Sequence, residues 1–246
     1  MQIKGILFDK DGTILKFQEL WLPVTKIVIR DFIIINKLPM TKEMEKMLEE
    51  ALGVEHDTVA FDGPLAYMTY EQIGEVVAKR LKEKKIVGGI DSGLAGRQFS
   101  VLYETVLSTE NNFYIPTCDL NRLFAQLKKK NIVIGLATAD NFPVTMHCLK
   151  QLGVEKEFDF IGCDDGVLRP KPYPDLFKAF CLKFGLEAKE VAVVGDTAND
   201  MQFAKQCGAV AVGTLSGVAG REVLIKQADY IVDTPAKIPS LIEENR

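Results

Sequence analysis

Short apolar runs that alternate with helical patterns constrain the fold of this 246-residue chain more than any other feature of its sequence. Residues 3–8 form one such run, and five more follow after residue 117. Strands that are apolar throughout are typical of a parallel sheet with helices on both faces. The pattern therefore predicts an α/β fold with a doubly wound parallel sheet. The later strands are expected at residues 131–138, 158–163, 191–194, 210–212 and 230–232.

The segment from residue 15 to residue 114 shows only helical periodicity. A loop at residues 54–63 and a Gly-rich stretch at residues 88–96 are expected to separate its helices. We therefore expect two domains, an α/β core made of residues 1–14 and 115–246, and an inserted helical cap made of residues 15–114. The helices of the inserted segment are expected at residues 21–38, 41–52, 64–85 and 97–108.

Composition argues against several classes of partner. The formal net charge is −4 and no tract is dense in Lys or Arg, so we expect no nucleic-acid surface. The longest apolar stretch, residues 20–40, is interrupted by charged residues and predicts a helix that does not span a membrane. The five cysteines are dispersed, which argues against a zinc site and favours reduced thiols in a cytoplasmic protein. The N-terminus enters a core strand at once, so no signal peptide is expected.

Two carboxylates follow the first apolar run, at Asp9 and Asp11. On a strand they would project to the same side, with Lys10 on the opposite side. Gly12 permits a sharp turn, and the hydroxyl of Thr13 follows close to the pair. Carboxylates held side by side repel each other unless a cation or a proton neutralises them, which favours a chemical role. Asp-x-Asp-Gly is also a common turn sequence, so the pair could simply end the strand.

A hydroxyl stands at the end of the second strand, at Thr138. Together with free backbone N–H groups at the start of the helix that follows, it would form an anion-binding site. The alternative is an ordinary helix N-cap supplied by Asp140 or Asn141. We expect the Asp140 side chain to point into that cap.

Two further strand ends carry charge. Lys171 lies between Pro170 and Pro172, which hold it in a set direction, so it could balance carboxylates or phosphate oxygens. The alternative is a solvent-facing lysine in a turn. Asp196 ends a buried strand and Asp200 follows one helical turn later, where it could also be an ordinary first-turn helix acid.

These strand ends should meet at one edge of the sheet, where ligands of doubly wound folds bind. Carboxylates, one fixed ammonium group and a hydroxyl suit a hard divalent ion such as Mg²⁺ together with a phosphate. No Gly-Lys dipeptide occurs in the chain, so a Walker-type phosphate loop is absent and ATP is not the expected substrate.

The four strand-end motifs resemble those of the haloacid dehalogenase superfamily of hydrolases. The likeness extends along the whole chain and, with the tail at residues 216–222, is strongest to phosphoglycolate phosphatase-like members. It implies a Rossmann-like core with an all-helical, C1-type cap. It also implies a Mg²⁺-dependent phosphomonoesterase that acts on a small phosphorylated, phosphoglycolate-like metabolite. The matching residues, in chain order, are Asp9-Lys10-Asp11-Gly12-Thr13, Thr138, Lys171, and Gly195-Asp196-Thr197 with Asp200.

The resemblance also implies roles for individual residues. Asp9 would be the nucleophile and would form an aspartyl-phosphate. Asp11 would act first as general acid and then as general base. Mg²⁺ would be held by Asp9, the backbone carbonyl of Asp11 and Asp196, with Asp200 bound directly or through water. Thr138, the N–H of Ala139 and Lys171 would bind the transferring phosphoryl group.

Substrate choice would come from the cap, where Arg97 is the first candidate for a substrate contact. His56, Tyr67 and Tyr70 are further candidates, although a loop position or packing explains each of them as well. A small phosphorylated molecule is the expected partner, and the chain is expected to be a monomer or a homodimer. Two alternatives remain, a phosphomutase of the same fold that resembles β-phosphoglucomutase, and a non-catalytic phosphate sensor.

Overall fold

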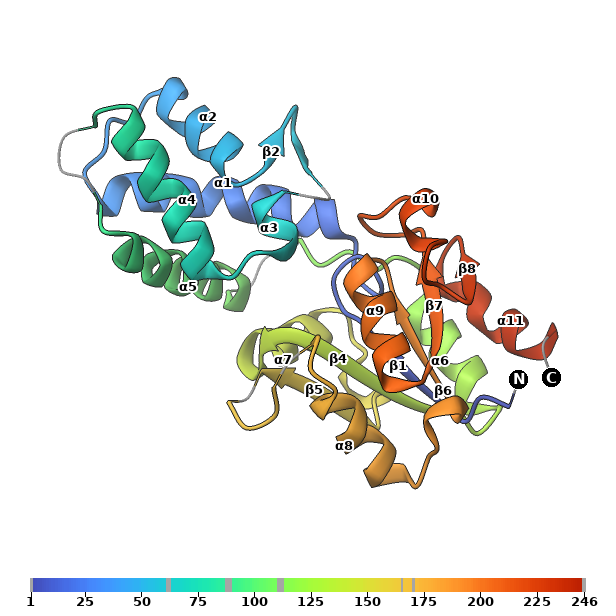
Figure 1. The fold of residues 1–246 in the computed structure, drawn as a ribbon. Helices are drawn as coiled ribbons and strands as arrows, with labels where there is room; N and C mark the ends of the chain where they lie inside the picture. Colours follow the sequence, from blue (N-terminus) through green and yellow to red (C-terminus); the bar gives the residue numbers. More distant parts are fainter. Residues whose placement is uncertain are drawn as a thin grey trace. The chain divides into compact units, whose positions relative to one another are not determined.

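The computed structural model describes residues 2–60, 63–86, 90–109, 113–164, 166–169 and 171–244. The chain divides into two compact units, one made of Met1–Phe17 and Tyr114–Arg246, the other of Gln18–Phe113. The first unit is built on an α/β sheet and the second is mostly helical (Figure 1). Among the residues that the structure describes, no helix has the length and apolar character that crossing a membrane requires.

A six-stranded sheet lies at the centre of the first unit, in the order β5-β4-β1-β6-β7-β8. All of its neighbouring strands pair in parallel, which confirms the predicted α/β class. The chain builds outward from β1 in both directions, as in a doubly wound fold. The strands are β1 (Gly5–Phe8), β4 (Val133–Asn141), β5 (Phe160–Asp164), β6 (Val191–Gly195), β7 (Val210–Thr214) and β8 (Tyr230–Val232).

Helices cover both faces of this sheet, and consecutive residues of β1 contact opposite layers. Leu7 belongs to a buried apolar cluster with Phe180 of α8 and Phe203 of α9. Phe8 contacts Phe124 of α6 edge-on, with ring centroids 5.8 Å apart. Such alternation explains why the strand is apolar at every position. The helices are α6 (Leu120–Lys128), α7 (Phe142–Gln151), α8 (Asp175–Phe184), α9 (Ala198–Cys207), α10 (Arg221–Leu224) and α11 (Ile238–Glu244), with short 3₁₀ turns at Glu155–Glu157, Ala188–Glu190 and Pro235–Lys237.

The strand register brings the predicted motifs to one edge of the sheet. Phe8, the last residue of β1, pairs with Leu136 of β4 and with Val194 of β6. Residues that follow these three positions therefore emerge at the same carboxyl edge. They include Asp9, Thr138 and Asp196.

The second unit has an aromatic core between its helices. Phe32 and Phe99 stack with ring centroids 4.5 Å apart. The fully buried Tyr103 shares a 3.0 Å hydrogen bond with the hydroxyl of Thr25. The elements of this unit are α1 (Phe17–Ile35), α2 (Lys42–Ala51), β2 (Val54–Glu55), β3 (Thr58–Val59), α3 (Pro64–Tyr67), α4 (Tyr70–Glu83) and α5 (Ser92–Ser108).

The expectation of a purely helical segment is wrong at the predicted loop, because β2 and β3 pair there as a small antiparallel hairpin. His56 and Asp57 form its turn with positive φ angles of 50° and 57°. The single helix expected at residues 64–85 is divided, since Thr69 caps a new helix through a reciprocal capping box with Gln72. The first helix runs from Phe17 to Ile35 and so lies a little earlier than expected.

The Gly-rich stretch does not separate helices over its whole length. Helix α5 begins at Ser92, so Gly93 and Gly96 are helical, whereas residues 88–89 lie outside the described part of the chain. A Cβ atom on Gly74 of α4 would lie 2.4 Å from the backbone nitrogen of Gly96. Glycine on both helices therefore permits a close approach of α4 and α5 that a larger residue would block.

Candidate active site

An acidic cluster forms at the carboxyl edge of the sheet. Carboxylate oxygens of Asp9, Asp196 and Asp200 lie within 4.8 Å of one another. The Nζ of Lys171 donates to Oδ1 of Asp9 at 2.5 Å and to Oδ1 of Asp200 at 2.6 Å. The structure thus brings four of the predicted site residues together. Pro170, one of the prolines that flank the lysine, lies outside the described residues.

Burial shifts the pKa values of the charged groups in this cluster. Burial raises the pKa of Asp9 to about 7, although the charge of Lys171 lowers it. Burial raises the pKa of Asp196 well above its ordinary range, and the carboxylates of Asp9 and Asp200 raise it further. For Lys171, burial lowers the pKa, but the carboxylates of Asp200 and Asp9 outweigh this and raise it. One ammonium group only partly neutralises three buried carboxylates, so a divalent cation would stabilise them further.

Asp196 is fully buried and its carboxylate is held on both sides. Its Oδ1 accepts from the hydroxyl of Thr13 at 3.2 Å, and its Oδ2 accepts from the amide of Val218 at 2.9 Å. A Cβ atom on Gly12 would lie 2.1 Å from Oδ2, and one on Gly217 would lie 1.9 Å from it. Gly12 also has a positive φ of 77°. Both glycines therefore provide the space that this carboxylate occupies.

Asp200 has both of the roles considered for it, since it caps a helix and also belongs to the acidic cluster. One oxygen, Oδ2, accepts from the Thr197 amide at 3.1 Å and from the Thr197 hydroxyl at 2.5 Å, which forms a capping box at the start of α9. The other oxygen accepts from Lys171. A helix-capping acid therefore also takes part in the cluster.

The anion site expected after the second strand lies on a longer strand than predicted, because β4 continues to Asn141. Thr138 is buried, and its hydroxyl oxygen accepts from the Asp140 amide at 3.2 Å. Asn141 caps α7, accepting from the amide of Val144 at 3.0 Å. The expectation that the Asp140 side chain points into the helix cap is wrong, because that carboxylate pairs with Lys10.

Lys10 was expected to point away from the acids, and this expectation is also wrong. Strand β1 ends at Phe8, so the alternation of side chains does not extend to residue 10. The Lys10 side chain is fully buried, and its Nζ lies 2.8 Å from Oδ2 of Asp11 and 2.8 Å from Oδ2 of Asp140. Burial lowers the pKa of Lys10, but the two carboxylates outweigh it and raise the pKa well above its ordinary value.

The loop that follows β7 contributes contacts that sequence reasoning missed. The Ser216 hydroxyl donates to the carbonyl of Gly12 at 2.9 Å, and the Val218 amide donates to Asp196. Residues 216–222 drew attention only through family likeness. Each contact involves a backbone group, the Gly12 carbonyl or the Val218 amide, and joins residues distant in the sequence, so the residue pattern does not indicate it.

The candidate substrate contacts belong to the other unit. Arg97 is exposed on α5. His56 lies in the turn of the β2–β3 hairpin. Tyr70 stacks on Tyr103 with centroids 5.4 Å apart, so packing explains its position. The side chain of Tyr67 lies outside the described residues.

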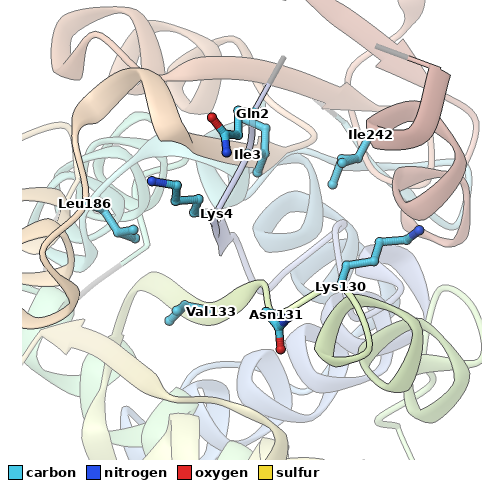
Figure 2. Close-up of a pocket in the computed structure, with 8 residues that line it drawn as sticks. All are labelled: Gln2, Ile3, Lys4, Lys130, Asn131, Val133, Leu186 and Ile242. Atoms are coloured by element: carbon cyan, nitrogen blue, oxygen red, sulfur yellow. The ribbon is translucent and has the colours of Figure 1, made fainter. Parts of the chain in front are cut away.

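A cavity of about 670 Å³ lies at the opposite, amino-terminal end of β1 and β4 (Figure 2). Both lysines in its wall form ion pairs, Lys4 with Glu190 at 2.5 Å and Lys130 with Glu243. The cavity contains none of the predicted site residues, and ligands of doubly wound folds bind at the other end of the strands. Its lining is Gln2, Ile3, Lys4, Lys130, Asn131, Val133, Leu186 and Ile242.

A doubly wound parallel sheet with buried acids at its carboxyl edge defines an α/β core that carries charged groups where such folds bind their ligands. The chain belongs to the haloacid dehalogenase-like hydrolases, because the model of that family matches residues 3–208. The family match confirms the resemblance of the strand-end motifs.

Individual relatives cover nearly the whole chain. A probable phosphatase, IndB, from Dickeya dadantii is 24% identical over 95% of this chain and 90% of its own. A phosphoglycolate phosphatase from Pectobacterium atrosepticum is 25% identical over 98% of this chain and 92% of its own. The crystal structure of a predicted phosphoglycolate phosphatase from Haemophilus somnus covers 98% of both chains, with a TM-score of 0.71 and 23% identity. The chain is thus an enzyme of the hydrolase class with phosphatase relatives, and the last likeness shows the fold.

Proposed function

We propose that this chain is a Mg²⁺-dependent phosphomonoesterase that hydrolyses a small phosphorylated metabolite through an aspartyl-phosphate on Asp9. One observation carries the proposal. Asp9 stands at the carboxyl end of β1, bonded to Lys171 at 2.5 Å, with Asp196 and Asp200 within 4.8 Å. A carboxylate held by a fixed ammonium group beside other acids suits the transfer of a dianionic phosphoryl group.

The donor atoms around Asp9 fit Mg²⁺, because hard oxygen ligands are the ones this ion prefers. We assign metal binding to the carboxylates of Asp9 and Asp196 and to the backbone carbonyl of Asp11, with Asp200 bound directly or through water. Bound Mg²⁺ would supply positive charge to the oxygens of the phosphoryl group. The raised pKa of Asp196 supports this assignment, since burial without a cation disfavours its charged form.

In the first step, a carboxylate oxygen of Asp9 attacks phosphorus and the bond from phosphorus to the leaving oxygen breaks. Asp11 donates a proton to that oxygen, so the product leaves as a neutral alcohol. In the second step, water attacks the phosphorus of the aspartyl-phosphate. Asp11, now a carboxylate, takes the proton of the water, and inorganic phosphate leaves with Asp9 restored.

The transferring group needs positive charge and hydrogen-bond donors around its oxygens. We assign this to the Lys171 ammonium, the Thr138 hydroxyl and the N–H of Ala139. Thr138 lies two residues beyond Leu136, which pairs with the last residue of β1. That register supports a place for the hydroxyl at the same sheet edge as Asp9.

We propose that the inserted segment and the α/β core have separate roles. Residues 15–114 act as the cap that selects the substrate, and Arg97 contacts it. A small phosphorylated, phosphoglycolate-like carboxylate is the proposed substrate, in keeping with the names of the relatives. We also propose a cytoplasmic location, because all five cysteines are free thiols and such thiols persist in a reducing compartment.

The test is phosphate release from a panel of small phosphomonoesters that includes phosphoglycolate, with Mg²⁺ and with a chelator. We expect Mg²⁺-dependent turnover concentrated on few compounds and lost in Asp9→Asn. The matched control is Asp233→Asn, since the Asp233 side chain is 76% exposed and pairs only with Arg221 at 3.7 Å among the ion pairs of the described chain. Turnover retained in Asp9→Asn would refute the mechanism, and isomerisation without phosphate release would favour a mutase.

A further inference from the structure

A buried lysine stands beside the proposed acid–base residue without a place in the mechanism given above. The Nζ of Lys10 lies 3.0 Å from Oδ1 and 2.8 Å from Oδ2 of Asp11, so it faces both oxygens of that carboxylate. It also lies 2.8 Å from Oδ2 of Asp140, near the end of β4. The lysine side chain is 1% exposed, whereas both carboxylates are 19% exposed.

Burial distinguishes this contact from the surface lysine pairs of the molecule. Lys128 and Glu157 are also 2.8 Å apart, but their side chains are 40% and 32% exposed. Such a surface pair contributes little to stability, because solvent screens its charges. An ammonium group removed from water must instead be satisfied by fixed partners, and in the described structure Asp11 and Asp140 supply them.

The arrangement therefore restrains Asp11 in a particular way. Contact with both oxygens limits rotation of the carboxylate, and Asp140 holds the ammonium group from the neighbouring strand. The Asp11 side chain keeps 19% of its surface exposed despite this contact. A general acid must point at its proton acceptor, so fixed orientation has a direct effect on rate.

We infer that Lys10 is a positioning residue that holds the Asp11 carboxylate in the orientation required for proton transfer, with Asp140 as its anchor. This inference rests on the proposed function. It assigns no contact between Lys10 and the substrate, so the lysine acts through Asp11.

A positioning lysine should affect two kinds of substrate differently, whereas a merely structural lysine should not. An alkyl phosphate needs a proton on its leaving oxygen, whereas p-nitrophenyl phosphate releases a stable anion without one. The ratio kcat/KM reports the steps up to the first irreversible one, which is transfer of the phosphoryl group to Asp9. Misplacing Asp11 should therefore lower kcat/KM for the alkyl ester and spare the aryl ester.

The experiment compares these two substrates in Lys10→Met, which has a similar length without the charge. We expect kcat/KM to fall by about 10²-fold or more for the alkyl phosphate and by less than about threefold for p-nitrophenyl phosphate. Lys128→Met, which breaks the surface pair with Glu157, should leave both values unchanged. Asp140→Asn should give a smaller loss of the same selectivity, since Lys10 keeps its contact with both oxygens of Asp11.

Further variants keep the test decisive if Lys10→Met does not fold. Lys10→Met/Asp140→Asn removes one charge of each sign, and it should fold more stably than Lys10→Met and show the same selective loss. Equal losses on both substrates, or none, would overturn the inference while Asp9→Asn still abolishes turnover. Failure of the wild-type protein to release phosphate from either ester would instead overturn the proposed function, and this role with it.

Discussion

Replacing Lys171 with Met should destabilise the metal-free protein and make its stability depend on a divalent cation. The ammonium group bonds Asp9 and Asp200, and without it three carboxylates remain within 4.8 Å of one another. Breaking a buried ion pair by removing one partner costs about 3–5 kcal/mol. In a chain of this size each kcal/mol lowers Tm by roughly 2–4 °C, so a decrease on the order of 6–20 °C is expected.

The destabilisation should be larger at about pH 8 than at about pH 5. The pKa of Asp9 in the folded protein, about 7, lies above its ordinary value of 3.8. The folded state therefore keeps a proton that the unfolded chain loses between these values, and the free energy of unfolding falls as pH rises through that window. Because Lys171 lowers the pKa of Asp9, its removal extends the window upward.

The assay is thermal unfolding of wild type and Lys171→Met in a chelator and in Mg²⁺ at both pH values. Mg²⁺ at about one hundred times its dissociation constant adds ~2.7 kcal/mol, so it should restore part of the loss. The control is Lys205→Met, because Lys205 and its partner Asp229 are 44% and 38% exposed and such a pair contributes about 0–1 kcal/mol. A Lys171→Met protein that unfolds like this control, or gains nothing from Mg²⁺, would refute the reasoning.

Three further substitutions test the packing of the helical unit, the space around Asp196 and a helix cap. Gly74→Ala should cost at least about 1–3 kcal/mol through overpacking and speed hydrogen exchange in α4 and α5, since its Cβ would lie 2.4 Å from backbone atoms of α5. Gly12→Ala should weaken Mg²⁺ binding measured by calorimetry, because its Cβ would lie 2.1 Å from Oδ2 of Asp196. Thr41→Ala removes the cap that accepts from the Met44 amide at 3.2 Å, and should lower the free energy of unfolding by about 1 kcal/mol.

Much of the α/β unit could be predicted because burial on both faces leaves a strand no polar positions. The run at residues 191–194 corresponds to β6, Val191–Gly195, in which every residue is buried. The charged residues that follow such runs stand out for the same reason. That contrast identified Asp9 and Asp196, which the structure places in one cluster.

Other features depend on partners that are distant in the sequence and could not be predicted. Whether Lys10 is buried depends on Asp140, which lies on another strand. The donor to Asp196 from Val218 is a backbone amide, which any residue except proline would supply. The structural role of a glycine is ambiguous in a sequence for a different reason. Glycine ends helices, but it also permits helices to pack closely, as Gly96 does within α5.

The most direct test of a reaction through Asp9 is to identify the residue that carries the phosphoryl group during turnover. Asp11→Asn should slow hydrolysis of the aspartyl-phosphate, so acid quenching with p-nitrophenyl phosphate and Mg²⁺ should trap it for peptide mass spectrometry. If Asp9 is the nucleophile, one phosphoryl group will be found, on the peptide that contains Asp9, and it will be absent in Asp9→Asn/Asp11→Asn. A phosphoryl group on another peptide, or p-nitrophenol release with no phosphorylated peptide, would contradict it.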